Sequence, residues 1–417
     1  MKALFLVIFS FSQIAFAQLE SNKLFKKQGS KVVTELTMNN YVARRSLLYY
    51  IPSSVDLTKP SKIVVYLHGG NSNMTQGRAL DVADTLFWGS ADGPFARKEG
   101  IRSIADRHQF VVVMPTTTSG WNDFTPFYIK ELLGHIRREL NPDPDKIFLM
   151  GHSMGAMGIC RSVSRLADEF AMFMPMSGGF QPHLKILSEV GPLYNTKVYV
   201  TSGAKYEFPE FVSWNEEFKL FLDDYFVRSH FGEDRLDWNF EVHDGTHNPN
   251  QQMMEEKLSV FTAEVKRNLY QANLFGSVFK GKSAPGHLIK NQSLRYFWFE
   301  ALEFRPFDEG ENAIGMDFRL YSENNVIHLK IDRPVAYRFD TRAHLKQIRL
   351  HLSEKMFDLD RPITVHLTTK RGVSDQQTTL FEGIVPRSPL AAQEIVQTSG
   401  DKGFHFEASL ELELPKN

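Results

Sequence analysis

The sequence predicts an α/β protein, in which helices cover a mostly parallel sheet, followed by a smaller all-β, sandwich-like unit. Three observations lead to this prediction. From about Val32 to Tyr270, short apolar runs alternate with amphipathic stretches, as strands and crossover helices do. Between Ala272 and Gln292, glycine and proline interrupt that pattern. Beyond this stretch the helical periodicity fades, and short strand patterns separated by turns remain.

Length and composition narrow the class of protein. The 417 residues exceed one ordinary domain of about 150 residues. Hydrophobic residues make up 42% and charged residues 23%, which excludes a disordered or disulfide-dense chain. The net charge of −1 leaves no global basic field for nucleic acid, and we expect no nucleic-acid partner. The single cysteine, Cys160, excludes an intrachain disulfide and a CxxC site.

The first 17 residues have the pattern of a cleavable signal peptide. Lys2 precedes an apolar run that ends in Ala15-Phe16-Ala17, with small residues at the first and third positions. We therefore expect cleavage after Ala17 and a secreted or periplasmic protein. No later stretch reaches 18 uninterrupted apolar residues, so we expect no integral membrane span.

We expect an α/β domain over 18–272, a linker over 273–290 and the sandwich-like domain over 291–417. The α/β domain should open with an antiparallel pair of strands and continue with buried parallel strands. The expected strands are Val32–Met38, Leu47–Ile51, Ile63–Leu67, Phe110–Met114, Ile147–Met150, Phe170–Met176, Val198–Val200 and Leu236–Val242. The expected helices are Phe127–Leu140, Ala156–Leu166, Val212–Phe226 and Gln251–Asn268.

The second domain should consist of short strands. Phe404 to Leu414 alternates apolar and polar residues along its whole length, as a half-buried strand does. The aromatic run Tyr296 to Phe299 should contribute mainly to a core if it lies on a strand. The other expected strands are Ala313–Leu320, Val326–Ile331, Ile348–Leu352 and Ile363–Thr368.

One serine stands at a junction suited to nucleophilic catalysis. Gly151-His152-Ser153-Met154-Gly155 matches G-x-S-x-G, directly after an expected strand and before an expected helix. Such a nucleophile elbow holds the serine in a strained turn with its hydroxyl above the sheet, and the flanking glycines avoid Cβ clashes. The alternative is a structural serine that caps the helix.

A glycine-rich loop follows the first central strand. In Leu67-His68-Gly69-Gly70-Asn71, a backbone N–H group can pair with the N–H of Met154 to form an oxyanion hole. The alternative is a simple tight turn. We expect His68 to orient or hold the loop instead of acting as a base.

The base should follow the last strand of the sheet. His247 occupies that place, and His243 is the competing histidine. The two together resemble a metal site only weakly, because no third ligand stands at a recognisable spacing, and we expect no metal. The triad acid should lie between the serine and the histidine. Glu207 is the first carboxylate after the strand at Val198, and the fallbacks are Glu210, Asp223 and Asp224.

Residues from roughly 30 to 270 resemble an α/β-hydrolase, and they are similar to secreted esterases of the poly(3-hydroxybutyrate) depolymerase, feruloyl esterase and dienelactone hydrolase group. The residues that carry the resemblance are His68-Gly69-Gly70, Trp121, Asp143 to Ile147, Gly151 to Gly155, and His247. The resemblance implies a nucleophile at Ser153, a base at His247, and oxyanion donors at Gly70 and Met154. Such esterases often carry Gly-x-x-Asp after the penultimate strand, but Tyr206 stands at the aspartate position here.

These features together predict an exported serine esterase that needs no cofactor and acts on a small-molecule or polymeric ester. Trp121 is the expected substrate-binding residue, and Trp214 and Phe124 are further candidates for a pocket wall. The alternatives are a serine peptidase of the same fold and a non-catalytic binding protein. We expect the carboxyl-terminal domain to pack against the first domain or to position the substrate.

Overall fold

A computed structural model describes residues 28–415, with gaps at 38–43, 57, 72, 90–99, 123–124, 183–190, 204–207, 229–236, 248–250, 282–293, 305–312, 333–344, 372–373, 389–392, 394–395 and 398–399. The expected signal peptide therefore lies outside the described residues. We call residues 28–272 the α/β unit and residues 273–415 the strand-rich unit.

The α/β unit contains an eight-stranded sheet with the order β1-β2-β4-β3-β5-β6-β7-β8. β1 pairs antiparallel with β2, and β2 pairs antiparallel with β4, whereas all later neighbours are parallel. The opening antiparallel pair and the parallel strands expected from the apolar runs are thus confirmed. The strands are β1 Lys31–Thr37, β2 Arg44–Tyr50, β3 Ser61–Leu67, β4 Phe110–Pro115, β5 Pro142–His152, β6 Met172–Met176, β7 Val198–Gly203 and β8 Trp238–His243.

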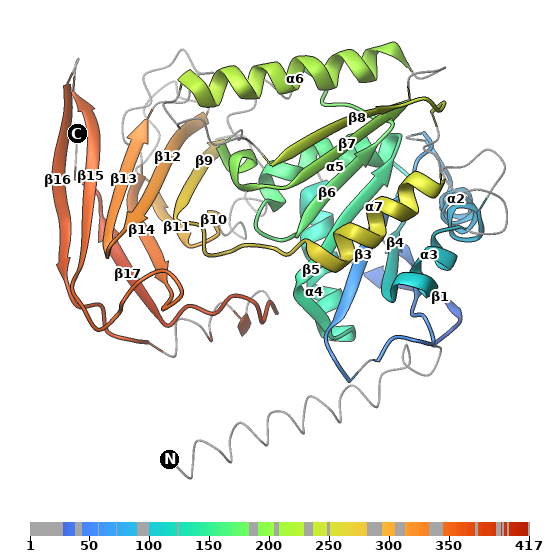
Figure 1. Cartoon of the computed structure of the whole chain (residues 1–417), viewed down its shortest axis with the longest axis horizontal. Coiled ribbons are helices and arrows are strands. Elements are labelled where there is room, and N and C mark those ends of the chain that lie inside the picture. The colour runs from blue at the N-terminus through green and yellow to red at the C-terminus, as the bar shows by residue number, and fades with distance from the viewer. Residues whose placement is uncertain are drawn as a thin grey trace, which may run out of the picture.

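Helices cover both faces of this sheet (Figure 1). Val64 and Tyr66 of β3 share a hydrophobic cluster with α2, α3 and α7, whereas Ile63 and Val65 share another with α4, α5 and α6. The alternation follows from the two-residue period of a strand, and it makes both faces apolar. The helices are α2 Gln76–Trp88, α3 Gly100–His108, α4 Thr125–Glu139, α5 Met154–Ser162, α6 Pro209–Arg228 and α7 Gln251–Glu264.

The strand-rich unit contains a four-stranded sheet, β10-β11-β14-β17, and a five-stranded sheet, β16-β15-β13-β12-β9. Buried side chains of both sheets form one hydrophobic cluster, and the ring of Phe299 on β11 stacks on Phe318 of β12 with centroids 3.8 Å apart. The two sheets therefore pack face to face. The strands are β9 Asn273–Gly281, β10 Leu294–Tyr296, β11 Phe299–Phe304, β12 Ala313–Glu323, β13 Val326–Asp332, β14 Leu345–Leu352, β15 Ile363–Arg371, β16 Ser374–Gly383 and β17 Ala408–Glu413.

One expectation for this unit differs from the structure, and another is confirmed. The linker expected over 273–290 is wrong for residues 273–281, which form β9 and pair antiparallel with β12 along their whole length. Residues 282–290 lie outside the described residues. The core role expected of the aromatic run is confirmed, because Phe297, Trp298 and Phe299 are all buried. The run does not lie on one strand: Phe297, at φ 53°, and Trp298 form the turn between β10 and β11.

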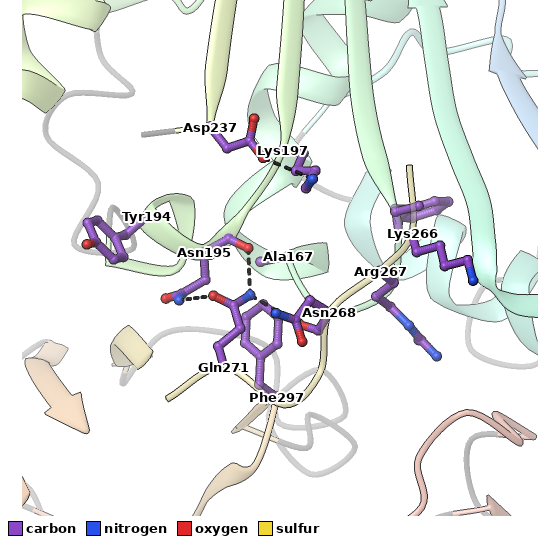
Figure 2. A pocket seen from close by; sticks show the side chains of 12 residues that line it. Ala167, Tyr194, Asn195, Lys197, Asp237, Lys266, Arg267, Asn268, Gln271 and Phe297 are labelled. Atoms are coloured by element: carbon purple, nitrogen blue, oxygen red, sulfur yellow. Dashed lines mark hydrogen bonds and ion pairs between the residues drawn. The ribbon is translucent and has the colours of Figure 1, made fainter. Parts of the chain in front are cut away.

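A cavity of about 220 Å³ lies where the two units meet (Figure 2). Residues that precede β6, β7 and β8 line it, so it is at the opposite edge of the sheet from Ser153. Lys197 and Asp237 form an ion pair of 3.1 Å in its wall. Below them the side-chain amide of Gln271 donates to the backbone oxygen of Asn195 at 3.1 Å. Both of these contacts lie within the α/β unit. The units are joined here by two other bonds: Nδ2 of Asn195 donates to the Asn273 oxygen at 2.7 Å, and Nε1–H of Trp298 donates to the Gln271 oxygen at 2.9 Å.

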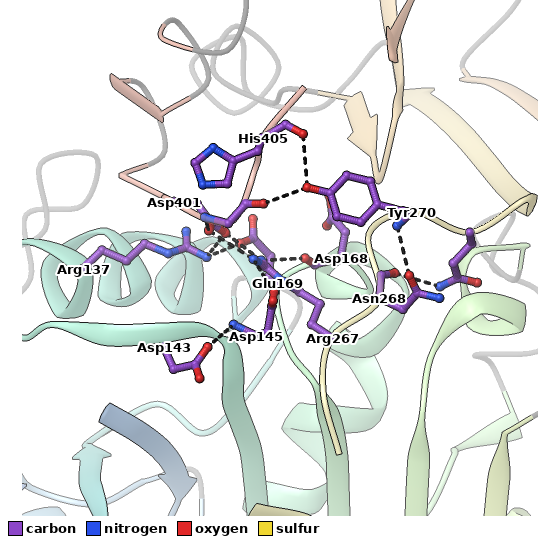
Figure 3. A network of polar contacts seen from close by, with 12 residues as sticks. Arg137, Asp143, Asp145, Asp168, Glu169, Arg267, Asn268, Tyr270, Asp401 and His405 are labelled. Carbon is purple, nitrogen blue, oxygen red and sulfur yellow. Dashed lines mark hydrogen bonds and ion pairs between the residues drawn. The ribbon is translucent and has the colours of Figure 1, made fainter. Parts of the chain in front are cut away.

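A buried set of charges lies nearby (Figure 3). Arg267, after α7, donates to Asp401 at 2.6 Å, and Arg137 of α4 donates to the same carboxylate at 2.7 Å. Arg137 also donates to Glu169 at 2.8 Å. The side chain of Asp401 is 0% exposed and that of Arg267 only 1%. Burial by itself would raise the pKa of Asp401. The two guanidinium groups stabilise the carboxylate more strongly, so the pKa of Asp401 lies well below its usual range. The strand-rich unit thus supplies a negative charge to cations of the α/β unit.

Candidate active site

Ser153 occupies a strained turn between β5 and α5. Its backbone has φ 57° and ψ −118°, a conformation that residues other than glycine rarely adopt. The turn has no space for larger neighbours: a Cβ at Gly155 would lie 2.1 Å from the Leu67 oxygen, and one at Gly151 would lie 2.8 Å from the carbonyl carbon of Gly155. The flanking glycines of the motif are therefore required by close packing of backbone on backbone.

The hydroxyl of Ser153 faces a histidine. Its Oγ lies 3.0 Å from Nε2 of His247, within hydrogen-bond distance. The serine side chain makes no capping hydrogen bond to α5, so the alternative of a helix-capping serine does not describe it. The structure thus brings together the two side chains that the sequence predicts as nucleophile and base.

His247 reaches the serine through a compact turn after β8. A Cβ at Gly203, the last residue of β7, would lie 2.1 Å from the oxygen of Thr246, so this turn rests directly on the end of β7. Nδ1 of His243 accepts a hydrogen bond of 3.0 Å from the backbone N–H of Gly245. His243 therefore shapes the turn, while His247 is the histidine at the serine.

The glycine-rich loop after β3 lies against the nucleophile. A Cβ at Gly69 would stand 3.3 Å from Cβ of Ser153, which leaves little room for a side chain. Gly70 follows at φ 114°, a conformation that favours glycine. Met154 is the first residue of α5, where the backbone N–H groups have no partner within the helix. The two predicted oxyanion donors thus belong to segments that flank Ser153.

His68 anchors this loop. Its Nε2 accepts from the backbone N–H of Thr117 at 3.0 Å, so Nδ1 carries the proton and donates to the Gly69 oxygen at 2.7 Å. Burial lowers the pKa of His68 to about 4, because the charged imidazolium would lose its hydration, while the bond to Gly69 raises it slightly. A neutral imidazole therefore holds the loop at neutral pH.

The structure corrects the substrate-binding role expected of Trp121. Its indole is 2% exposed, and Nε1–H donates to the backbone oxygen of His68 at 2.9 Å. The ring also stacks on Tyr128, with centroids 5.9 Å apart. Trp121 therefore supports the loop from the protein interior and does not face a solvent-open pocket. Phe124 lies outside the described residues, whereas Trp214 is half-exposed on α6.

An aromatic group at the start of α6 borders the histidine. The ring of Phe208 is 5.7 Å from that of His247 in an edge-on arrangement, and Phe208 is 55% exposed. Phe211 lies 6.3 Å from the same imidazole and 5.7 Å from Trp214. The sequence did not single out Phe208 and Phe211, because an aromatic residue at a helix start is ordinary. The group forms an apolar wall beside Ser153 and His247.

The described residues reduce the number of candidates for the triad acid, but they do not identify it. Glu207, the first candidate, lies outside them. Asp223 pairs with Lys219 at 2.6 Å, and at 1.5 Å per residue it stands about 18 Å along α6 from Phe211. Asp224 is one residue further, so both are too distant to touch His247. Glu210 is exposed in the first turn of α6, and with Glu207 it remains a candidate.

Two findings apply only to the residues that the structure describes. Within them, no three His, Cys, Asp or Glu side chains gather in a way that would hold a metal ion. Within the same residues, no helix combines the length and the apolar character needed to cross a membrane.

Comparisons with known proteins give distant matches. No protein-family model matches the chain. A bifunctional acetylxylan esterase/xylanase of Neocallimastix patriciarum is 27% identical over 152 residues, which are 34% of this chain and 20% of that relative's length. The chain thus spans only about one fifth of the curated relative.

Among solved structures, a thermostable esterase has 15% identity and a TM-score of 0.42, and covers 57% of this chain and 63% of its own. A feruloyl esterase module from Clostridium thermocellum has 15% identity and a TM-score of 0.41, over 56% of this chain and 86% of its own. An S-formylglutathione hydrolase from Staphylococcus aureus has 18% identity and a TM-score of 0.38, over 56% and 95%. These structural neighbours include esterases, and each has a TM-score below 0.5.

Proposed function

We propose that this chain hydrolyses carboxylic esters through an acyl-enzyme intermediate on Ser153. The observation that carries the proposal is the 3.0 Å contact between Ser153 Oγ and His247 Nε2, at a strained strand–helix turn. A serine is a weak nucleophile until an adjacent base takes its proton, and this contact supplies the base. The names of the matched esterases agree with the proposal, although their activities belong to those proteins.

The reaction follows from the arrangement. Ser153 Oγ attacks the ester carbonyl while its proton passes to His247 Nε2, and the imidazolium then returns a proton to the leaving alcohol. Water attacks the acyl-enzyme by the reverse route and releases the acid. In the proposed oxyanion hole, the N–H groups of Gly70 and Met154 bind the developing oxyanion, each contributing about 3 kcal/mol. Glu207 is the proposed acid that orients His247, and no cofactor is required.

The setting of the site suggests the kind of ester. The exposed ring of Phe208 and its neighbour Phe211 offer apolar contact to a group attached to the ester. We propose a small-molecule or polymeric carboxylic ester with an apolar portion. Export through residues 1–17 and a packing or substrate-positioning role for the strand-rich unit remain part of this proposal.

The test is the Ser153→Ala variant assayed with p-nitrophenyl esters. We expect the activity to fall by at least about 10⁴-fold, because the nucleophile is removed. Ser259→Ala is the control, since this hydroxyl lies on α7 and donates to the Glu256 oxygen at 2.8 Å. Unchanged hydrolysis by the Ser153 variant would refute the proposal.

Two further measurements separate the alternatives. A panel of matched esters and amides distinguishes an esterase from a peptidase. A fluorophosphonate probe should label Ser153 in the wild-type protein. If the probe does not label Ser153 and no ester is cleaved, the chain is a non-catalytic binding protein.

A further inference from the structure

The residue immediately before the nucleophile makes a contact that the proposed mechanism does not use. His152 is the last residue of β5 and only 6% exposed. Its Nε2 lies 2.9 Å from the backbone oxygen of His247. Because a carbonyl oxygen can only accept, Nε2 of His152 must carry a proton and donate it in this hydrogen bond. The two imidazole rings also touch, with centroids 4.8 Å apart at 54°.

The other side of His152 faces the glycine-rich loop. A Cβ added at Gly69 would lie 3.4 Å from Nδ1 of His152 and 3.2 Å from its backbone oxygen. The side chain thus fills the space between the loop proposed to bind the oxyanion and the turn that carries the base. The buried imidazole of His152 lies between the two segments, and the peptide bond joins His152 to Ser153.

This placement links the base directly to the nucleophile. The turn that delivers His247 rests on Gly203 through its backbone, and the rings of Phe208 and Phe211 lie beside the imidazole. Those contacts position the turn against β7 and α6. The bond from His152 instead ties the main chain of His247 to the residue next to Ser153.

We propose that His152 is a positioning residue for the reaction: its Nε2–H group holds the carbonyl of His247, which keeps His247 Nε2 at 3.0 Å from Ser153 Oγ. The inference rests on the proposed esterase function. His152 does not itself accept the serine proton, because its Nε2 is already engaged as a donor to the carbonyl. Its loss should slow proton transfer and leave substrate binding nearly intact.

The size of the effect follows from the geometry required. A reacting group displaced by about 1 Å can lower a rate by about 100-fold. His152→Leu removes the Nε2–H donor and replaces the imidazole with an apolar side chain of similar volume. His152→Gln keeps an amide N–H donor near the position of Nε2. We therefore expect kcat to fall by about 100-fold in the leucine variant, with KM within about twofold, and to recover to within about 10-fold of wild type in the glutamine variant.

The control is His135→Leu on α4, whose ring faces Tyr49 at 6.2 Å and takes no part in the site. Wild-type kcat in His152→Leu, or equal losses in the leucine and glutamine variants when both retain the wild-type melting temperature, would overturn the proposal. If the leucine variant does not fold, the tautomer of His152 in the wild-type protein tests the proposal. ¹⁵N NMR should show a proton on Nε2 of His152. An Nδ1–H tautomer would overturn the proposal.

Failure of the proposed function is distinguishable from failure of this inference. If wild-type protein neither hydrolyses esters nor reacts with a fluorophosphonate at Ser153, the esterase proposal fails. If the wild-type protein does both and His152→Leu reacts with the probe at the wild-type rate, only the positioning role fails. If His152 had only a structural role, His152→Leu would lower the melting temperature but would not lower kcat selectively while KM stays nearly unchanged.

Discussion

Gly203→Ala should damage catalysis by moving the base, although the residue is not part of the triad. A Cβ at this position would lie 2.1 Å from the Thr246 oxygen and 2.8 Å from the Gly245 oxygen, and both are backbone atoms that cannot rotate away. A normal contact would require the turn to retreat by about 1 Å. His247 follows this turn, so its Nε2 should lose the 3.0 Å contact with Ser153 Oγ.

A displacement of that size predicts a fall in kcat of about 100-fold, equivalent to about 2.7 kcal/mol of activation free energy. The assay is steady-state hydrolysis of p-nitrophenyl acetate, combined with the rate of fluorophosphonate labelling. Gly77→Ala is a matched control, because a Cβ at Gly77 of α2 would meet nothing within 4 Å. Wild-type kcat and labelling in a folded Gly203→Ala protein would show that the turn does not set the position of the base.

Two further substitutions test the buried polar groups. Asp401→Asn removes the carboxylate that Arg267 and Arg137 share. We expect the free energy of unfolding in urea to fall by about 3 kcal/mol, because each buried cation loses one of its two carboxylate partners. An unchanged midpoint would contradict this. For His68, the folded pKa of about 4 lies below the unfolded value of 6.5, so the unfolded chain binds more protons between these pH values and stability is lost as pH falls through that window. The stability advantage of wild type over His68→Gln should therefore shrink by up to about 3 kcal/mol from pH 6.5 to pH 4, and an advantage that is constant over this range in urea titrations would refute the assignment.

The central sheet was predictable because its strands are buried on both faces. The run Phe110–Met114 has no polar position, and the structure contains it as β4, Phe110–Pro115. The boundaries were less predictable where a neighbouring strand decides them. β5 begins at Pro142, well before the apolar run at Ile147, since Pro142 pairs with Ser61 of β3. Similarly, the glycines at positions 276 and 281 indicated a linker, but β9 contains both of them and β12 provides its antiparallel partner.

The candidate site was predictable where its chemistry is local in sequence. Ser153 lies in a motif between a strand and a helix, and His247 follows the last strand, so both could be found from order alone. The roles of His152 and Gly203 depend on contacts with a turn far along the chain, and no local pattern indicates them. Trp121 was expected in the pocket wall because it is a large aromatic residue, whereas its burial beneath His68 depends on how the loop packs.

The charges at Asp401 constrain how this protein can be divided. Arg267 and Arg137 belong to the α/β unit, but the carboxylate that they share comes from the strand-rich unit. A fragment that stops after residue 281 would keep Glu169 beside Arg137 and Asp145 beside Arg267, but it would lose the buried carboxylate that the two guanidinium groups share. We therefore expect the α/β unit to be less stable when it is produced without the strand-rich unit. A chimera in which another domain replaces the strand-rich unit would need an acidic side chain at the position of the Asp401 carboxylate.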